Sequence, residues 1–315
     1  MIDFRYHLVS IIAVFLALAV GIVLGTAALN GPVLDTLRSN IDRLTQDKRS
    51  LETNVQKLQA DVVASDDFAT AVGPQLVSGT LADQRVLLVT TPGTPGQLAD
   101  RLKPLLVSAG AQVTGELKLL PALSNRDSRQ VVEDLVAQVV PAGVELPKGE
   151  PYERAATELA AALGRVPGRE GINSGEAQAV VSAFQEAGLV DYSGTSQDLR
   201  QATAVVVLGR AAPQGDPDPA QVSELATLLA VAGSFDDASG GVVVAGPAGS
   251  GADNGLLKEL RKDSGTARRV SGVDNADRGV GLVAVVRALA EQLRGTAGQY
   301  GTGAGSAGPL PSPAP

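Results

Sequence analysis

The sequence predicts an α/β protein in which a single transmembrane helix and a coiled coil precede a doubly wound parallel-sheet domain with a helical insertion. Three patterns predict this arrangement: an uncharged apolar run near the N-terminus, a heptad repeat after it, and apolar strands that alternate with helices. The expected organisation is a short head at 1–7, a transmembrane helix at 8–29, a coiled coil at 33–65, an α/β domain at 80–295 with the insertion at about 124–191, and a disordered tail at 296–315.

The apolar run from Leu8 to Leu29 contains no charged residue. As a helix it rises roughly 33 Å, enough to cross a hydrocarbon core of about 30 Å. A cleaved signal peptide, with its cleavage site among the small residues at 26–28, is the alternative interpretation. The run is longer than a usual signal core and its basic head is thin, so we expect a retained anchor. Lys and Arg near the two ends do not decide the orientation.

One face of this predicted helix carries only small residues. They recur four positions apart and are Ala13, Ala17, Gly21 and Gly25. Gly21 and Gly25 form a G-x-x-x-G pair, which lets two helix backbones approach closely in lipid. Small residues are also common in membrane helices that pair with nothing, so this ridge alone does not establish a contact.

A heptad repeat follows Gly31-Pro32, where we expect the membrane helix to be interrupted. Apolar residues alternate at three- and four-residue steps, with Lys48 as the one polar exception. The seam consists of Leu34, Leu37, Ile41, Leu44, Lys48, Leu51, Val55, Leu58 and Val62. β-Branched residues at the first heptad position with Leu at the second favour a parallel two-stranded coiled coil.

The partner of this seam stays open at the level of sequence. In a parallel homodimer Asp47 would face Glu52 of the second copy, so the flanking charges do not favour self-association. We therefore expect either a homodimer held by the seam and the transmembrane helix, or a seam that receives another protein's helix. An amphipathic helix packed on its own domain is the structural alternative.

The remainder of the chain alternates between strands and helices. Strands are predicted at 85–90, 112–119, 204–208, 241–245 and, more weakly, 267–270; helices are predicted at 97–109, 220–232, 254–262 and 279–293. Uninterrupted apolar strands between helices indicate a parallel sheet covered on both faces, of Rossmann or flavodoxin type with about five strands. The tail from 296 to 315 is Gly, Ala, Ser and Pro with little apolar content, so we expect it to be disordered.

No segment of the sequence carries a recognised catalytic or cofactor motif. The loop TTPGTPG after the first strand matches neither dinucleotide nor phosphate-loop patterns, and Pro92 and Pro95 remove N–H donors. Asp236-Asp237, and Asp274 with Asp277, are candidate ligands for a hard cation, although helix caps and turns are the commoner role. We expect no enzyme activity, no cofactor and no metal site.

Composition restricts the partners further. The chain of 315 residues has a net charge of −8, which opposes binding to nucleic acid. It contains no Cys, one His and one Met, so thiolate, thioether and imidazole ligands for copper are almost absent.

Several segments together resemble the MctB copper-transporter family of actinobacteria. They are the head MIDFRYHLVSIIAVFLALAVGIVLGTAAL, the heptads, the turn Val273-Asp-Asn-Ala-Asp277 and the Gly298-Gln-Tyr-Gly301 tail. The resemblance implies a single-pass protein of the cell membrane with its C-terminal domain extracytoplasmic, a role in copper export, and pore formation. It also extends to SteB-like proteins, which are connected with cell separation through a SteA-type membrane partner.

Two hypotheses follow. In the first, the chain is a transport component that controls copper leaving the cell. In the second, it is a coiled-coil scaffold that binds an envelope or cell-division partner and does not carry copper itself. One apolar helix cannot line a pore alone, so any direct path for copper requires an oligomer lined by oxygen groups.

Overall fold

A computed structural model of the chain describes residues 4–194 and 199–312, and within 27–34 it describes the backbone alone. The chain forms two compact units, residues 1–64 and 65–315. The predicted head at 1–7 lies partly outside the described residues, as does the end of the tail at 313–315.

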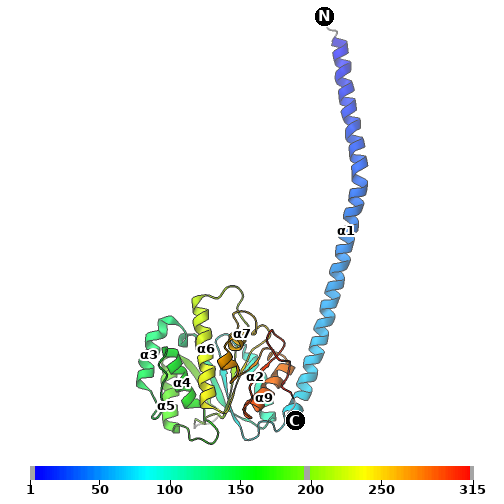
Figure 1. Cartoon of the computed structure of the whole chain (residues 1–315). Helices are drawn as coiled ribbons and strands as arrows, with labels where there is room; N and C mark the ends of the chain where they lie inside the picture. Colours follow the sequence, from blue (N-terminus) through cyan, green and yellow to red (C-terminus); the bar gives the residue numbers. More distant parts are fainter. Residues whose placement is uncertain (1–3, 195–198, 313–315) are drawn as a thin grey trace. The chain divides into compact units, whose positions relative to one another are not determined.

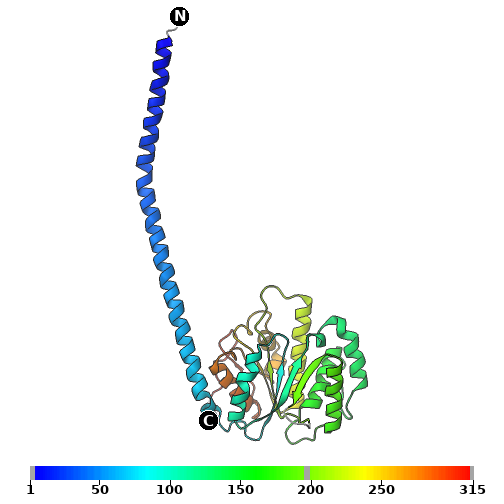
Figure 2. The same ribbon diagram turned by 180° about the vertical axis from the view of Figure 1, so that it is seen from behind.

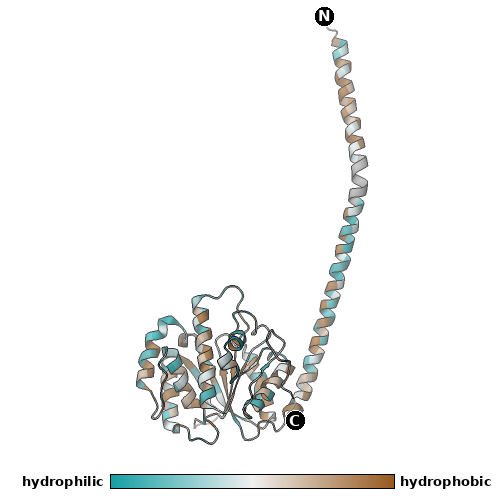
Figure 3. Cartoon of the chain, viewed as in Figure 1, coloured by the Kyte–Doolittle hydropathy of each residue, from teal (hydrophilic) through white to brown (hydrophobic). Residues whose placement is uncertain are grey.

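The first element is one long helix, α1 (Phe4–Val77), of 74 residues. We predicted a break at Gly31-Pro32, and that prediction is wrong because the helix continues through both residues. Proline removes a single backbone donor and strains one turn, a cost that regular helix on both sides can absorb as a bend. In Figure 3 apolar colouring dominates the N-terminal part of α1, and hydrophilic colouring appears farther along.

The apolar part of α1 is long enough to cross a membrane. Among the described residues, one segment meets this criterion of length and composition, Phe4–Thr26, and none of its side chains is buried. It overlaps the predicted span at 8–29 and begins four residues earlier.

The C-terminal unit is built on a mostly parallel sheet. In the described residues this sheet has seven strands in the order β3-β2-β1-β4-β5-β6-β7. Every neighbouring pair is parallel except β2 and β3, which are antiparallel. The strands are β1 (Arg85–Thr90), β2 (Gln112–Leu119), β3 (Val190–Gly194), β4 (Ala204–Leu208), β5 (Val242–Ala245), β6 (Ser271–Val273) and β7 (Gln299–Tyr300).

Helices connect these strands and cover both faces of the sheet (Figures 1 and 2). The α-helices are α2 (Gly96–Ser108), α3 (Arg129–Gln138), α4 (Pro151–Leu163), α5 (Ser174–Glu186), α6 (Pro219–Ala238), α7 (Leu256–Lys262), α8 (Ser264–Ala267) and α9 (Gly279–Gln292). Two 3-10 turns, η1 (Pro121–Leu123) and η2 (Arg126–Ser128), follow β2. Helices α3 to α7 contribute to the core on one face, and α2 and α9 contribute to the core on the other.

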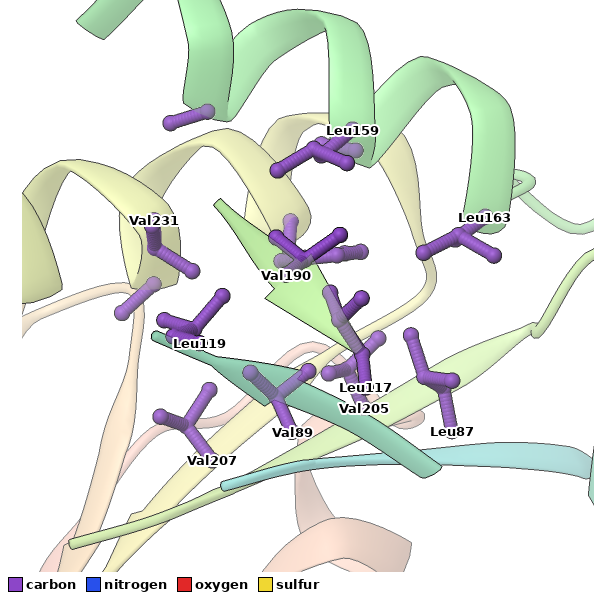
Figure 4. Close-up of a cluster of buried hydrophobic side chains, with 14 of the residues drawn as sticks. Leu87, Val89, Leu117, Leu119, Leu159, Leu163, Val190, Val205, Val207 and Val231 are labelled. Atoms are coloured by element: carbon purple, nitrogen blue, oxygen red, sulfur yellow. The ribbon is translucent and has the colours of Figure 1, made fainter. Parts of the chain in front are cut away.

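Alternate side chains of each central strand enter opposite cores. In β1, Leu87 and Val89 belong to the core under α3 to α7, whereas Val86 and Leu88 belong to the core under α2 and α9. Figure 4 shows the first of these cores, with Leu117 of β2 and Val205 of β4 beside the β1 residues. Each fully buried Val or Leu contributes about 1.5–3 kcal/mol. This two-sided burial is why the strands read as uninterrupted apolar runs.

Long apolar strands were predicted well, and short ones were not. Strands β1, β2 and β4 have the predicted bounds, and β5 begins one residue later than predicted. The strand predicted at 267–270 is wrong, because α8 ends at Ala267 and β6 occupies Ser271–Val273. The sheet also has two more strands than the five expected, since β3 and β7 are short and polar.

The predicted disorder of the tail is wrong for most of its length. Gln299 and Tyr300 form β7 beside β6, and the backbone N–H groups of Thr302 and Gly303 donate to Asp274 at 2.8 and 3.0 Å. Gly301 has a φ of 124°, and a Cβ on Gly303 would lie 2.7 Å from the Asp274 carboxylate. The glycines of this segment therefore allow its backbone to lie close to the Asp274 carboxylate. Their abundance had instead suggested disorder.

Candidate functional site

The small-residue ridge lies on the apolar part of α1. Helical spacing places Ala13, Ala17, Gly21 and Gly25 on one face. A Cβ added to Gly21 or Gly25 would meet no atom within 4 Å. The ridge is thus open to close approach by another helix or by lipid.

The heptad seam lies farther along the same helix, and its apolar side chains are exposed. The exposed fractions run from 42% for Val62 to 68% for Leu44. The other exposed members are Leu37, Ile41, Leu51, Val55 and Leu58; for Leu34 only the backbone is described. These side chains form an exposed apolar line along the helix, interrupted by Lys48.

Charge along the seam is partly balanced within the helix. Lys48 Nζ lies 3.6 Å from Glu52 Oε1, one helical turn ahead. This exposed pair contributes only a few tenths of a kcal/mol to the helix. The Lys48 ammonium nevertheless lies beside the Glu52 carboxylate. In a parallel pair of copies, this carboxylate would face Asp47 of the other copy.

The last turns of α1 belong to the C-terminal unit and are fastened there by Asp66. Its Oδ1 accepts a hydrogen bond from Gly279 N at the start of α9, and its Oδ2 lies 3.1 Å from Arg101 Nη2 on α2. Arg101 Nη1 in turn donates to the Asp277 carbonyl oxygen at 2.5 Å. Val77, the last residue of α1, is fully buried.

A cavity of about 470 Å³ opens where the chain leaves β1 and β4. These neighbouring strands lead in opposite directions along the sheet, and ligands of open parallel sheets bind at such a point. The cavity is lined by Pro92 and Gly93 after β1 and by Arg210 after β4. Arg210 Nη2 lies 2.8 Å from Glu224 Oε2, and a Cβ on Gly93 would lie 2.8 Å from Arg210 Cδ.

In the loop after β1, Thr91 and Thr94 donate hydrogen bonds to carbonyl oxygens of the loop itself and of β4. Thr91 N donates to the Leu208 carbonyl oxygen at 2.9 Å, and Thr94 N donates to the Thr91 carbonyl oxygen at 3.1 Å. The Thr94 hydroxyl also donates to Leu208 O at 2.8 Å. A phosphate cradle uses free backbone N–H groups, and those of Thr91 and Thr94 are already engaged.

A larger cavity of about 710 Å³ shares Ser124 and Asn125 with the first. It is bordered by the 3-10 turns after β2 and by the first residues of α3, α4 and α6. Sequence reasoning missed this region, because its residues come from two separate segments, the predicted insertion and residues 217–226, and neither segment carries a motif.

The paired carboxylates considered for a hard cation lie beside arginines. Arg269 Nη2 is 2.8 Å from Asp236 Oδ2 and also pairs with Asp237. Burial raises the pKa of Asp236, and the hydrogen bond from Arg269 opposes that rise. Arg261 Nη1 lies 2.7 Å from Asp274 Oδ2.

Asp277 has a different role, since its Oδ1 accepts from Ala248 N at 2.7 Å. Across the described residues, no group of three or more His, Cys, Asp or Glu side chains converges on a point where a metal ion would fit.

Residues 1–311 match the family model described as "Copper transport outer membrane protein, MctB". The chain belongs to the MctB family. This MctB-family chain is 29% identical over 320 residues to "Copper transporter MctB" of Mycobacterium tuberculosis (strain ATCC 25618 / H37Rv), covering 97% of this chain and 98% of that protein. The protein of the same name from Mycobacterium leprae (strain TN) is 29% identical over 323 residues, with the same coverage.

The match to the MctB family includes every feature described above. The ridge, the seam, the Asp66 contacts and both cavities all fall within residues 1–311. The resemblance seen in the sequence is thereby confirmed.

Proposed function

We propose that this MctB-family chain acts in copper export and copper homeostasis as a non-enzymatic, single-pass membrane protein of the cell envelope, with its C-terminal domain outside the cytoplasm. The observation that supports this proposal most strongly is the family match over residues 1–311, together with relatives named copper transporters. The apolar segment Phe4–Thr26 supplies the membrane anchor.

The proposed role in copper does not rest on a soft-metal site within one copy. The chain contains no Cys, one His and one Met, and Cu(I) prefers thiolate and thioether ligands. We propose that copper either crosses an assembly of several chains along oxygen ligands or responds to this protein through a partner.

The assembly forms through α1 in this proposal. Seam residues such as Leu44 and Leu51, at 68% and 64% exposure, bury their side chains in a parallel two-stranded coiled coil with a second copy. Gly21 and Gly25 allow the membrane segments to approach each other. Each Leu side chain buried in this way contributes about 1.5–3 kcal/mol, so several seam layers suffice for a dimer.

The C-terminal unit is proposed to be a doubly wound, Rossmann-like domain. The run β3-β2-β1-β4-β5-β6 matches the strand order of that fold class, and β7 extends it at one edge. The antiparallel β3 departs from an all-parallel arrangement.

A second candidate function is a scaffold that binds an envelope or cell-division partner, such as a SteA-type membrane protein, without carrying copper. The exposed seam favours this candidate, and so does the pairing of Asp47 with Glu52 that a parallel homodimer would impose. In that case the partner contributes a helix to the seam.

A complementation experiment tests the copper role. A host that lacks its own family member is supplied with the wild-type chain, and growth is measured over a series of copper concentrations together with intracellular copper. We expect the wild-type chain to restore copper resistance and lower intracellular copper. Unchanged copper sensitivity, combined with a corrected cell-separation defect, would favour the scaffold.

Calorimetric titration of the full chain in lipid nanodiscs separates direct from indirect handling of copper. Micromolar or tighter binding of Cu(I) or Cu(II) that survives a mild chelator would support a direct path through this protein. Heat changes no larger than those of empty nanodiscs would support an indirect role.

The double variant Leu44→Asp with Leu51→Asp tests the seam. Two charged residues in adjacent layers abolish helix pairing, so cross-linked dimers or captured partner should fall at least tenfold. Gln46→Asp with Thr53→Asp is the matched control, because these residues have the same seven-residue separation on the opposite face of α1. Normal association of the seam variant would show that the seam is not the surface through which the chain associates.

A further inference from the structure

The cavity of about 710 Å³ in the C-terminal unit has the size and position of a small-molecule site. Binding pockets for small molecules usually enclose about 300–1,000 Å³ and favour the carboxyl edge of parallel sheets. This cavity begins at the residues that follow β2 and adjoins the crevice between β1 and β4. All of its lining residues belong to the unit formed by residues 65–315.

The floor of the cavity is apolar and its walls are rigid. Leu123 and Val132 contribute the floor and are 3% and 2% exposed. Pro151, Pro217 and Pro219 line the sides. Proline has a fixed φ and no N–H group, so these walls present apolar surface with little freedom to collapse.

Two polar side chains of the cavity offer hydrogen-bond donors that pair with no other described residue. Within the described part of the chain, the guanidinium of Arg126 and the hydroxyl of Tyr152 make no hydrogen bond or salt bridge. Arg129 differs, because its guanidinium pairs with Glu150 at the start of α4. One free cation and one free hydroxyl therefore border the same apolar floor.

Tyr152 is held in its donor form. Burial, followed by the charges of Glu153 and Glu150, raises the pKa of its hydroxyl, and the charge of Arg129 opposes the rise only in part. The phenol consequently stays protonated at neutral pH and donates a hydrogen bond to an acceptor in the cavity.

We propose that this cavity binds a small organic anion, with a carboxylate or phosphate head bound by Arg126 and Tyr152 and an apolar body packed on Leu123 and Val132. Arginine suits this head because its planar fork of donors matches carboxylate and phosphate oxygens. The charge of the exposed Arg126 guanidinium favours an anion over a neutral ligand of the same shape.

Ligand-observed NMR of the full chain in lipid nanodiscs tests this proposal. The probes are 4-phenylbutanoate and phenyl phosphate as anions and 4-phenylbutanamide as the neutral counterpart. We expect at least one anion to bind wild-type protein at least tenfold more tightly than the amide. Arg126→Ala should weaken that anion at least tenfold and leave the amide unchanged, and Tyr152→Phe should weaken the anion by a smaller factor.

Arg169→Ala is the matched control. This exposed arginine lies in the turn after α4, at the end of that helix away from Tyr152, and does not line the cavity. It should leave all affinities unchanged. The proposal is overturned if no anion binds at millimolar concentration, if anion and amide bind alike, or if Arg126→Ala and Arg169→Ala behave the same. Circular dichroism of each variant verifies that the fold is intact.

Discussion

Two buried carboxylates of the C-terminal unit, Asp274 and Glu158, lie in opposite electrostatic surroundings. Asp274 is 2% exposed and faces Arg261, whose side chain is 7% exposed. Glu158 is fully buried on α4, and neither of its oxygens has a hydrogen-bond partner among the described residues. Asp274 thus has a cationic partner, whereas burial favours the neutral form of Glu158.

The Asp274 site also holds the C-terminal segment. Arg261 donates to the carbonyl oxygens of Tyr300 and Ala304, both at 3.0 Å, while Asp274 accepts from Thr302 and Gly303. Asp274→Ala leaves a buried arginine without its counter-ion, so we expect a loss of about 3–5 kcal/mol. Urea unfolding of the full chain in detergent micelles, followed by circular dichroism, measures this loss.

Lys262→Ala is the control for that measurement. Its partner Glu259 lies 3.4 Å away and the lysine side chain is 72% exposed, so the change should cost less than about 1 kcal/mol. Equal effects of the two substitutions would contradict the structural role of Asp274.

Glu158 gives the protein a pH-dependent stability. Burial raises its pKa from 4.5 to about 8, and the charge of Arg154 opposes the rise. Between these two values the unfolded chain releases the proton and the folded chain keeps it. This group therefore lowers the free energy of unfolding as pH rises from 4.5 to 8, by about 1.4 kcal/mol for each unit of pKa difference.

Glu158→Gln should remove this dependence. We expect the variant to be more stable than wild type at pH 8 and close to wild type at pH 4.5, in urea unfolding at both pH values. Exposed Glu170→Gln should retain the wild-type pH profile. A variant that is less stable than wild type at pH 8 would show that the carboxylate is ionised and paired in the folded protein.

Neither of these sites was predicted as such from sequence. Asp274 was considered only as a candidate cation ligand together with Asp277, because its partner Arg261 stands thirteen positions away on another element. Glu158 lies in a helix rich in alanine, and nothing in the pattern distinguishes it from a solvated glutamate. Which side chains of different elements pair, and which are buried, depends on the fold. The spacing of residues along the sequence does not show it.

At the scale of elements, side-chain periodicity predicted the long apolar strands and amphipathic helices but missed the short strands. The apolar strand Ala204–Leu208 and the amphipathic helix Gly96–Ser108 are long enough to be recognised. Strand Ser271–Val273 is built on Gly272, where a Cβ would lie 2.3 Å from Gln299 Oε1. Such a strand is defined by the close approach of its neighbour, so its own sequence carries little signal.

Two helical glycines differ in the space around them, so we expect their substitution by alanine to change stability in opposite directions. A Cβ on Gly233 of α6 meets nothing within 4 Å, whereas a Cβ on Gly281 of α9 would lie 1.9 Å from the Asn275 carbonyl oxygen. Gly233→Ala should stabilise the protein by about 0.5–1 kcal/mol through helix propensity. Gly281→Ala should destabilise it by about 2 kcal/mol or more, since backbone must move.

Thermal unfolding of the two variants side by side gives the comparison. A rise in Tm for Gly233→Ala and a fall for Gly281→Ala are expected. Equal shifts of the same sign would mean that α9 does not start against Asn275 as described.

At the scale of the whole chain, the C-terminal segment completes a unit whose first strand lies more than two hundred residues earlier. A chain that ends at Gly298 loses β7 and every backbone partner that the segment supplies to Asp274 and Arg261. We expect its free energy of unfolding to fall by about 3 kcal/mol or more. A chain that ends at Ser312 keeps all these contacts and should match the full chain in urea unfolding and in resistance to protease.

The position of β7 also affects the order of events during synthesis. The buried Arg261 and Asp274 meet their backbone partners only when residues near 303 have left the ribosome. Until then the edge of β6 is open, and Arg261 and Asp274 lack the backbone partners that residues 300–304 supply. The edge of the sheet at β6 is therefore completed only after residues 299–303 have been made, long after the strand β1 that lies in the same sheet.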